Sequence, residues 1–209
     1  MTERGNRSTA KARFASAALK AMGGWRFVTE VPKPRRAVCL AVPHTHNMDG
    51  LLLVTLAQSV GMPISWMVKD AWVKPPGIGH LVRAVGGVGV DRSKARGMVG
   101  SMIDAFEQNE DLYLVIPPEG TRSLTEYWKS GFYRIALGAG VPIVPGFLDY
   151  PNKRGGFGEP IDMTGNVKAD MDKIRAYYSD AKAMARDPDK FGPLRLRDES
   201  ESASSGANG

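Results

Sequence analysis

Two of the three histidines in this 209-residue chain lie in one six-residue segment, His44-Thr-His-Asn-Met-Asp49. A histidine with its free pKa of about 6.5 is mostly neutral near neutral pH and can accept a proton from an attacking hydroxyl group. A carboxylate that fixes the tautomer of the imidazole makes such a base more effective, as in hydrolase triads. His44 and Asp49 are therefore a candidate dyad for general-base chemistry.

The same segment could instead bind a metal ion, because His44, His46 and Asp49 resemble a set of three ligands. Catalytic zinc usually takes three protein ligands and a water molecule. His80 is the only other imidazole, and the single cysteine, Cys39, lies in an apolar run typical of a core strand. We therefore predict no metal site and no bound cofactor, with His46 and His80 as structural or surface residues.

A second polar segment, Pro118-Glu-Gly-Thr-Arg-Ser123, could bind an anion. Gly120 lets the backbone approach a ligand, Thr121 offers a hydroxyl group, and the planar guanidinium of Arg122 suits phosphate. Glu119 accepts hydrogen bonds when ionised, so we expect it to hold a loop, an arginine or a substrate hydroxyl. Taken alone, the segment is slightly better explained as a solvated turn around a glycine.

Arg92, in Asp91-Arg92-Ser93, places another guanidinium between a predicted strand and the start of a predicted helix. The guanidinium and the helix N-terminus beside it would both attract an anion. Alternatively, Arg92 forms a surface ion pair with Asp91. The chain contains no P-loop, no dinucleotide-type glycine spacing and no glycine-flanked nucleophilic serine. The absence of these motifs argues against a nucleotide-binding protein of those types and against a hydrolase with a serine nucleophile.

Short apolar runs alternate with helical patterns along the chain, which predicts an α/β fold. Strands are expected at 37–42, 64–68, 87–90, 112–116 and 141–150. Helices are expected at 48–60, 78–85, 93–108, 129–140 and 167–185, with Ser93 capping the third. We therefore predict a single-domain αβ sandwich with a largely parallel central sheet. Ligands of such sheets bind beyond the carboxyl ends of the strands, where the polar segments lie.

The positive charge of the chain is concentrated at its beginning. Residues 1–36 hold nine basic and two acidic side chains, a net charge of +7, whereas the other 173 residues hold 19 basic and 20 acidic ones. At helical spacing one face of this segment carries Ala10, Phe14, Ala17, Ala18, Ala21, Met22 and Trp25. An anionic membrane surface suits such a helix over residues 8–27, and packing on its own domain is the alternative. The neutral body disfavours nucleic acid.

The domain organisation expected is a basic amphipathic arm at 1–36, one domain at 37–197 and a disordered tail at 198–209. No apolar run reaches the length of about 18 residues that spans a bilayer, and no secretory signal is evident. We expect a cytoplasmic protein bound peripherally to the inner face of the membrane.

Four segments occur in an order that resembles the glycerolipid acyltransferases of the lysophosphatidate acyltransferase type. The family's His-four residues-Asp block is matched by His44 and Asp49, and its glycine-rich strand ending in Arg by residues 86–92. Its Pro-Glu-Gly-Thr-Arg-Ser block is matched in full at 118–123, and its Val-Pro block at 141–145. The chain departs from many members at Pro43, where Asn is common.

The resemblance implies transfer of a fatty acyl group from acyl-CoA or acyl carrier protein to a hydroxyl of a lyso-phospholipid, with 1-acylglycerol-3-phosphate as the expected acceptor. It implies that His44 is the base and that Asp49 orients it. It also implies a site for the phosphate head group, made by Arg92, Glu119, Gly120, Thr121 and Arg122. A hydrolase that uses the same dyad and a non-catalytic membrane-surface lipid-binding module are the alternatives.

Overall fold

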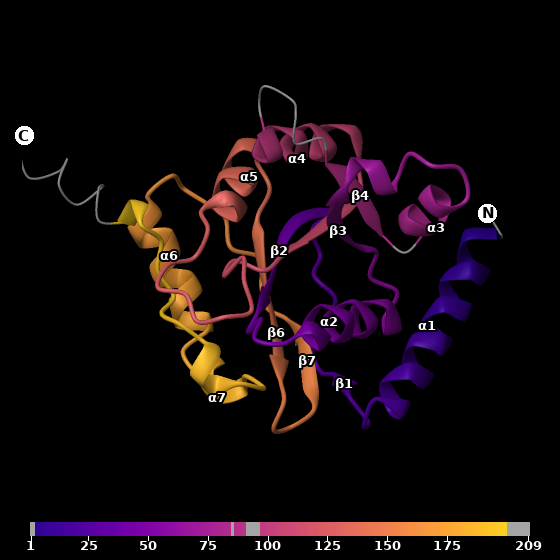
Figure 1. The fold of residues 1–209 in the computed structure, drawn as a ribbon, viewed down its shortest axis with the longest axis horizontal. Coiled ribbons are helices and arrows are strands. Elements are labelled where there is room, and N and C mark those ends of the chain that lie inside the picture. Colours follow the sequence, from indigo (N-terminus) through magenta and orange to yellow (C-terminus); the bar gives the residue numbers. More distant parts are fainter. Residues whose placement is uncertain (1–2, 85, 91–96, 200–209) are drawn as a thin grey trace, which may run out of the picture.

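The computed structural model describes residues 3–84, 86–90 and 97–199. Their centre is a seven-stranded sheet in the order β1-β7-β6-β2-β5-β3-β4 (Figure 1). Every strand pair in it is parallel except β6 with β7. The predicted α/β fold with a largely parallel sheet is therefore confirmed. The strands are β1 (Arg26–Phe27), β2 (Arg36–Val42), β3 (Ile64–Lys69), β4 (Gly87–Val90), β5 (Leu112–Ile116), β6 (Ile143–Asp149) and β7 (Arg154–Phe157).

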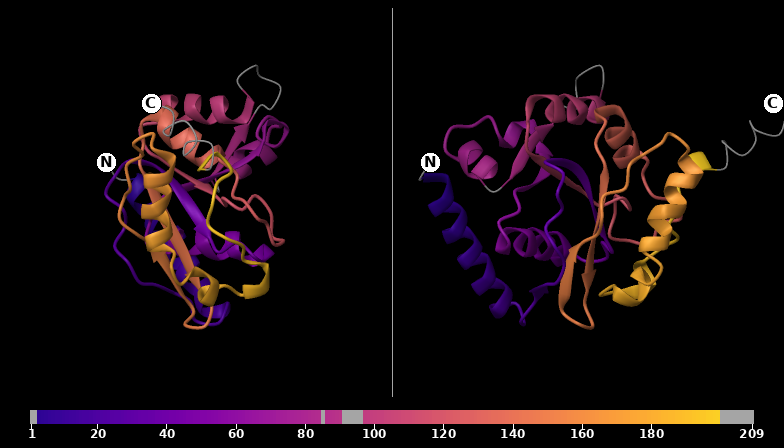
Figure 2. Two further views of the ribbon diagram at one scale, coloured as in Figure 1. Left: turned by 90° about the vertical axis from the view of Figure 1, so that its left-hand side faces the viewer. Right: turned by 180° about the vertical axis from the view of Figure 1, so that it is seen from behind.

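Helices cover both faces of the sheet (Figure 2). They are α1 (Glu3–Ala21), α2 (Asn47–Ser59), α3 (Ile78–Ala84), α4 (Gly97–Gln108), α5 (Gly131–Ala139), α6 (Val167–Tyr177) and α7 (Ala181–Met184), with the 3-10 turns η1 (Asp70–Trp72) and η2 (Pro188–Lys190). Side chains of the central strand β2 alternate between the two faces. Val38 and Leu40 pack with α4, α5 and α6, and Ala37 and Cys39 pack with α1 and α2.

The N-terminal helix α1 packs on the domain, which is one of the two arrangements left open by the sequence. Ala15 and Leu19 of α1 are buried, at 2% and 3% exposure, and Leu19 belongs to the same core cluster as the leucines of α2. The apolar face expected from the sequence is therefore only partly turned toward the core, because Met22 packs against it while Phe14 is 79% exposed. The following strand, β1, extends the sheet by pairing with β7.

The C-terminal part departs from the sequence expectations in three places. The helix predicted at 167–185 is two helices, because α6 ends at Tyr177 and α7 begins at Ala181. Strand β7 was not predicted, since its sequence Arg-Gly-Gly-Phe lacks the β-branched residues typical of strands. Asp198 and Glu199, placed in the expected tail, form ion pairs with Arg134 and Arg175. The Ser93 cap and residues 200–209 lie outside the described residues.

Candidate active site

Three neighbouring strands end at one edge of the sheet and deliver the polar residues to it. β2 lies between β5 and β6 and is parallel to both, with Leu40 opposite Ile116 and Val42 opposite Phe147. The segments that follow the three carboxyl ends are 43–49 after β2, 117–123 after β5 and Tyr150 after β6. The predicted dyad and the predicted anion-binding segment therefore lie at the same edge.

Asp49 lies in the first turn of α2 and is almost completely buried, at 1% exposure. Its Oδ2 atom accepts hydrogen bonds from the backbone N–H groups of Thr45 and His46, both at 2.7 Å. The same oxygen lies 4.0 Å from Nδ1 of His44. The carboxylate thus caps the helix and lies beside the imidazole of His44 without forming a hydrogen bond to it.

His44 is an imidazole with an unsatisfied nitrogen beside a carboxylate. Its side chain is 14% exposed, and its Nδ1 has no hydrogen-bond partner among the described residues. Burial lowers the pKa of His44 below its usual 6.5, the Asp49 charge opposes this, and the Arg122 charge adds to it. His44 is therefore neutral near neutral pH, the state that accepts a proton.

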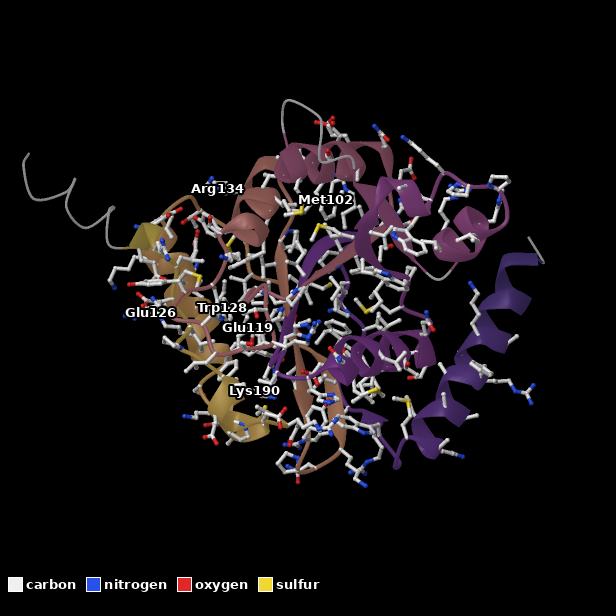
Figure 3. All side chains as sticks on the ribbon, viewed as in Figure 1. Met102, Glu119, Glu126, Trp128, Arg134 and Lys190 are labelled. Atoms are coloured by element: carbon white, nitrogen blue, oxygen red, sulfur yellow. The ribbon has the colours of Figure 1, made fainter. Side chains whose placement is uncertain are left out.

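Glu119 connects the two motif segments. It is 3% exposed, and its Oε1 accepts a hydrogen bond of 3.1 Å from the backbone N–H of His44, while Oε2 has no partner among the described residues. Burial raises the pKa of this carboxyl from 4.5 to about 7. Figure 3 shows Glu119 in the interior of the molecule, between the sheet and the C-terminal helices. Its contacts favour the loop-holding role over direct contact with a phosphate.

The residues after Glu119 form an exposed turn. Gly120 has a φ of +64°, a conformation that other residues adopt at a cost, and a Cβ there would lie 2.9 Å from Cγ of Lys129. Thr121 and Arg122 are exposed, and the Arg122 charge acts on His44. The turn can therefore present a cation beside the dyad. Arg92 lies outside the described residues.

Two residues that were not singled out from the sequence contact the segment 44–49, which contains His44 and Asp49. The hydroxyl of Tyr150 donates a hydrogen bond to Oδ1 of Asp49, and Nη1 of Arg186 lies 2.9 Å from Nδ1 of His46. That Nδ1 also accepts from the backbone N–H of Met48, at 3.0 Å. Tyr150 could have been found, because it is the last residue of the strand predicted at 141–150 and so lies at the edge where ligands bind. Arg186 carries no such signal.

The described part of the chain contains no group of three or more histidine, cysteine, aspartate or glutamate residues that could hold a metal ion. His46 is instead occupied with helix capping and with Arg186, in agreement with the structural role predicted for it. What the site offers is a neutral base, a buried carboxylate and a nearby cation. Those groups suit activation of a hydroxyl group next to an anionic substituent.

A parallel-sheet fold with a histidine–aspartate pair at the carboxyl ends of its strands is compatible with acyl transfer, and sequence comparison identifies the family. Residues 26–148 match the family model described as Acyltransferase, and the chain belongs to this family. The match includes both motif segments and ends two residues before Tyr150.

Several curated relatives carry one name. The chain is 29% identical over 121 residues to the "Probable 1-acyl-sn-glycerol-3-phosphate acyltransferase" of Mycoplasma pneumoniae, covering 54% of this chain and 44% of the relative. It is 31% identical over 108 residues to the 1-acyl-sn-glycerol-3-phosphate acyltransferase of Escherichia coli, covering 49% and 42%. The chain thus spans less than half the length of these relatives.

The fold resembles that of the crystallised 1-acyl-sn-glycerophosphate (LPA) acyltransferase, PlsC, from Thermotoga maritima. The TM-score is 0.56 at 20% sequence identity, over 86% of this chain and 80% of that one. This likeness supports the fold assignment. None of the helices in the described part of the chain is both long and apolar enough to cross a bilayer.

Proposed function

We propose that the protein is an O-acyltransferase that moves a fatty acyl group from acyl-CoA or acyl carrier protein to a hydroxyl of a lyso-phospholipid, with 1-acylglycerol-3-phosphate as the acceptor. The observation that carries the proposal is the buried Asp49 carboxylate 4.0 Å from Nδ1 of His44, in a chain of the Acyltransferase family. The names of the relatives supply the acceptor.

In the proposed reaction, Nε2 of His44 takes the proton of the acceptor hydroxyl as its oxygen attacks the thioester carbonyl. Asp49 stabilises the imidazolium through Nδ1, once the 4.0 Å separation closes to a hydrogen bond. The new C–O bond forms, the C–S bond breaks, and the departing thiolate takes the proton from His44. The products are the acylated acceptor and a free thiol, and no covalent enzyme intermediate is required.

The head group of the acceptor would be held by the exposed turn. Arg122 supplies a bidentate cation for phosphate, and Thr121 and the backbone of Gly120 supply hydrogen bonds. The family resemblance adds Arg92 to this set. Glu119 would act through the loop, by accepting the backbone N–H of His44 at 3.1 Å. Holding the phosphate away from the reacting centre orients the hydroxyl for attack.

Measurement of free thiol released from acyl-CoA, with and without 1-acylglycerol-3-phosphate, tests the proposal. Acceptor-dependent release that is lost in His44→Ala is the expected result. Release that does not need the acceptor would indicate the hydrolase. No release from either acyl-CoA or acyl carrier protein would refute the acyltransferase and favour the lipid-binding module.

We also propose that residues 8–27 contact an anionic membrane surface, at the cytoplasmic leaflet. The face of α1 that does not pack on α2 supports this, because Phe14 is 79% exposed on it. The cations Arg13 and Lys20 are exposed on the same helix. Each basic residue near an anionic surface contributes about 1 kcal/mol, and a buried aromatic ring adds apolar area.

Sedimentation with vesicles containing phosphatidylglycerol tests this contact. The variant Arg13→Glu/Phe14→Ser/Lys20→Glu should bind at least about tenfold more weakly, since it reverses two charges and removes one ring. Leu137→Ser is the control, because Leu137 is 45% exposed but lies on α5. Equal binding by the wild type and the triple variant would place the contact elsewhere.

A further inference from the structure

Tyr150 contributes a third hydrogen bond to the buried carboxylate of Asp49. It lies directly after β6, the neighbour of β2, and its hydroxyl donates to Oδ1. The other oxygen, Oδ2, accepts the backbone N–H groups of Thr45 and His46. Donors from two separate segments therefore reach both oxygens, and this restricts rotation of the carboxylate about its χ2 bond.

Tyr150 is itself held by two contacts. Its ring packs edge-on against the ring of Trp25, with centroids 4.9 Å apart and an interplanar angle of 86°. Its backbone N–H donates to the carbonyl of Met184 at 3.0 Å. Trp25 is 7% exposed, so the aromatic contact is an interior one. The tyrosine hydroxyl thus has a fixed position relative to the sheet.

Burial, together with the charged groups around Tyr150, leaves its hydroxyl protonated. Burial raises its pKa above the usual value, as does its hydrogen bond to the Asp49 carboxylate. The nearby Arg186 lowers the pKa and Asp187 raises it, by smaller effects. The hydroxyl of Tyr150 therefore remains a hydrogen-bond donor near neutral pH, where His44 is neutral.

We propose that Tyr150 is a positioning residue for the reaction: its hydroxyl, fixed by the ring of Trp25, sets the orientation in which Asp49 faces His44. The inference rests on the proposed acyl transfer. Oδ2 lies 4.0 Å from Nδ1 of His44, so a small rotation of the carboxylate decides whether a hydrogen bond forms during turnover. Through its contact with the ring of Tyr150, Trp25 of the N-terminal segment also affects the chemical step. This role is separate from the proposed contact of that segment with a membrane.

Tyr150→Phe tests the proposal because it keeps the ring on Trp25 and removes only the hydroxyl. We expect kcat to fall about tenfold or more, which is the effect of one hydrogen bond to a charged group, with KM for both substrates within about twofold of wild type. A purely structural role would leave kcat unchanged, because the ring packing is retained. Tyr177→Phe is the control, since this tyrosine is 37% exposed on α6, and its kcat should equal that of wild type.

The contribution of Trp25 is tested with a double-mutant cycle. Trp25→Phe should lower kcat, and Trp25→Phe/Tyr150→Phe should lower it no further than Tyr150→Phe alone, because both changes act through one hydroxyl. Multiplicative effects would refute the part of the proposal that concerns Trp25. Wild-type kcat in Tyr150→Phe would refute the whole of it.

A readout that does not need activity separates this inference from the proposed reaction. Crystal structures of the wild type and Tyr150→Phe should show the Asp49 carboxylate rotated in the variant, with Oδ2 farther from Nδ1 of His44. An Asp49 carboxylate in the same orientation in both would overturn the positioning role. Lack of transfer by the wild type, together with a rotated carboxylate in the variant, would refute the reaction and support the positioning.

Discussion

The stability of the Glu119→Gln variant, measured relative to that of the wild type, should increase as the pH rises. Glu119 is 3% exposed, and burial raises the pKa of its carboxyl from 4.5 to about 7. Between these two values the folded state binds a proton that the unfolded state has lost, so the stability of the wild type falls as the pH increases. The glutamine side chain has no charge to bury, and its amide oxygen can still accept the N–H of His44.

The pKa difference sets the size of the effect. Because the pKa of this carboxyl is 4.5 when unfolded and about 7 when folded, the protein loses about 3 kcal/mol of folding stability once the pH exceeds both values. Part of this is already lost at about pH 5, so the difference in stability between Glu119→Gln and wild type should grow by about 2.5 kcal/mol between about pH 5 and about pH 8.5. Any cost of placing an amide in the site is the same at both pH values and cancels.

Urea unfolding of both proteins at the two pH values measures this change. Glu126→Gln is the control, because Glu126 follows in the same loop, and its side chain is 66% exposed in an ion pair with Arg195. Its stability relative to wild type should change by less than about 0.5 kcal/mol between the two pH values. A Glu119→Gln difference that is equal at both pH values would show that the carboxyl is not protonated by burial.

Two further predictions concern the reaction. His44→Ala should lower kcat by about 10² to 10⁴, the usual contribution of a general base, and near-normal turnover in the thiol-release assay would contradict the proposed mechanism. Arg122→Gln should move the acid limb of the pH profile of kcat/KM to higher pH, because the Arg122 charge lowers the pKa of His44. An uncharged acceptor should be used for that profile, so that loss of phosphate binding does not contribute, and an unchanged limb would contradict this interaction.

Patterns in the sequence predicted the central strands well, since β2 and β5 are continuous apolar runs that stay buried between neighbours on both sides. They did not predict β1 and β7, because a two-residue strand and a glycine-rich strand have no periodicity to recognise. The pairing of these strands with each other and with β6 stabilises them instead.

The candidate site was predictable to the extent that its residues lie in contiguous motifs. His44, Asp49 and Glu119 follow adjacent strands, and the structure brings them together through hydrogen bonds to one loop. Tyr150 and Arg186 reach the same segment from positions 101 and 140 residues away from their partners. The position of Tyr150 at the end of a predicted strand is a signal in the sequence, whereas only the tertiary structure reveals the contact of Arg186.

The orientation of α1 could not be predicted from its composition. Alanine is abundant on several sides of this helix, so the sequence gives little preference for one buried face. The contact with α2 decides the matter by burying Leu19 and leaving Phe14 exposed.

The strands at the two margins of the sheet have a consequence for self-association. An exposed sheet edge can pair with the edge of another molecule, and long, flat edges are the ones that promote aggregation. Here the outermost strands are β1, with two residues, and β4, with four, two of them the glycines Gly87 and Gly89. Within the residues that the structure describes, either margin offers a short ladder of hydrogen bonds to a second copy. The order of the strands thus places the long, apolar segments β2, β5 and β6 inside the sheet, where they are protected from intermolecular pairing.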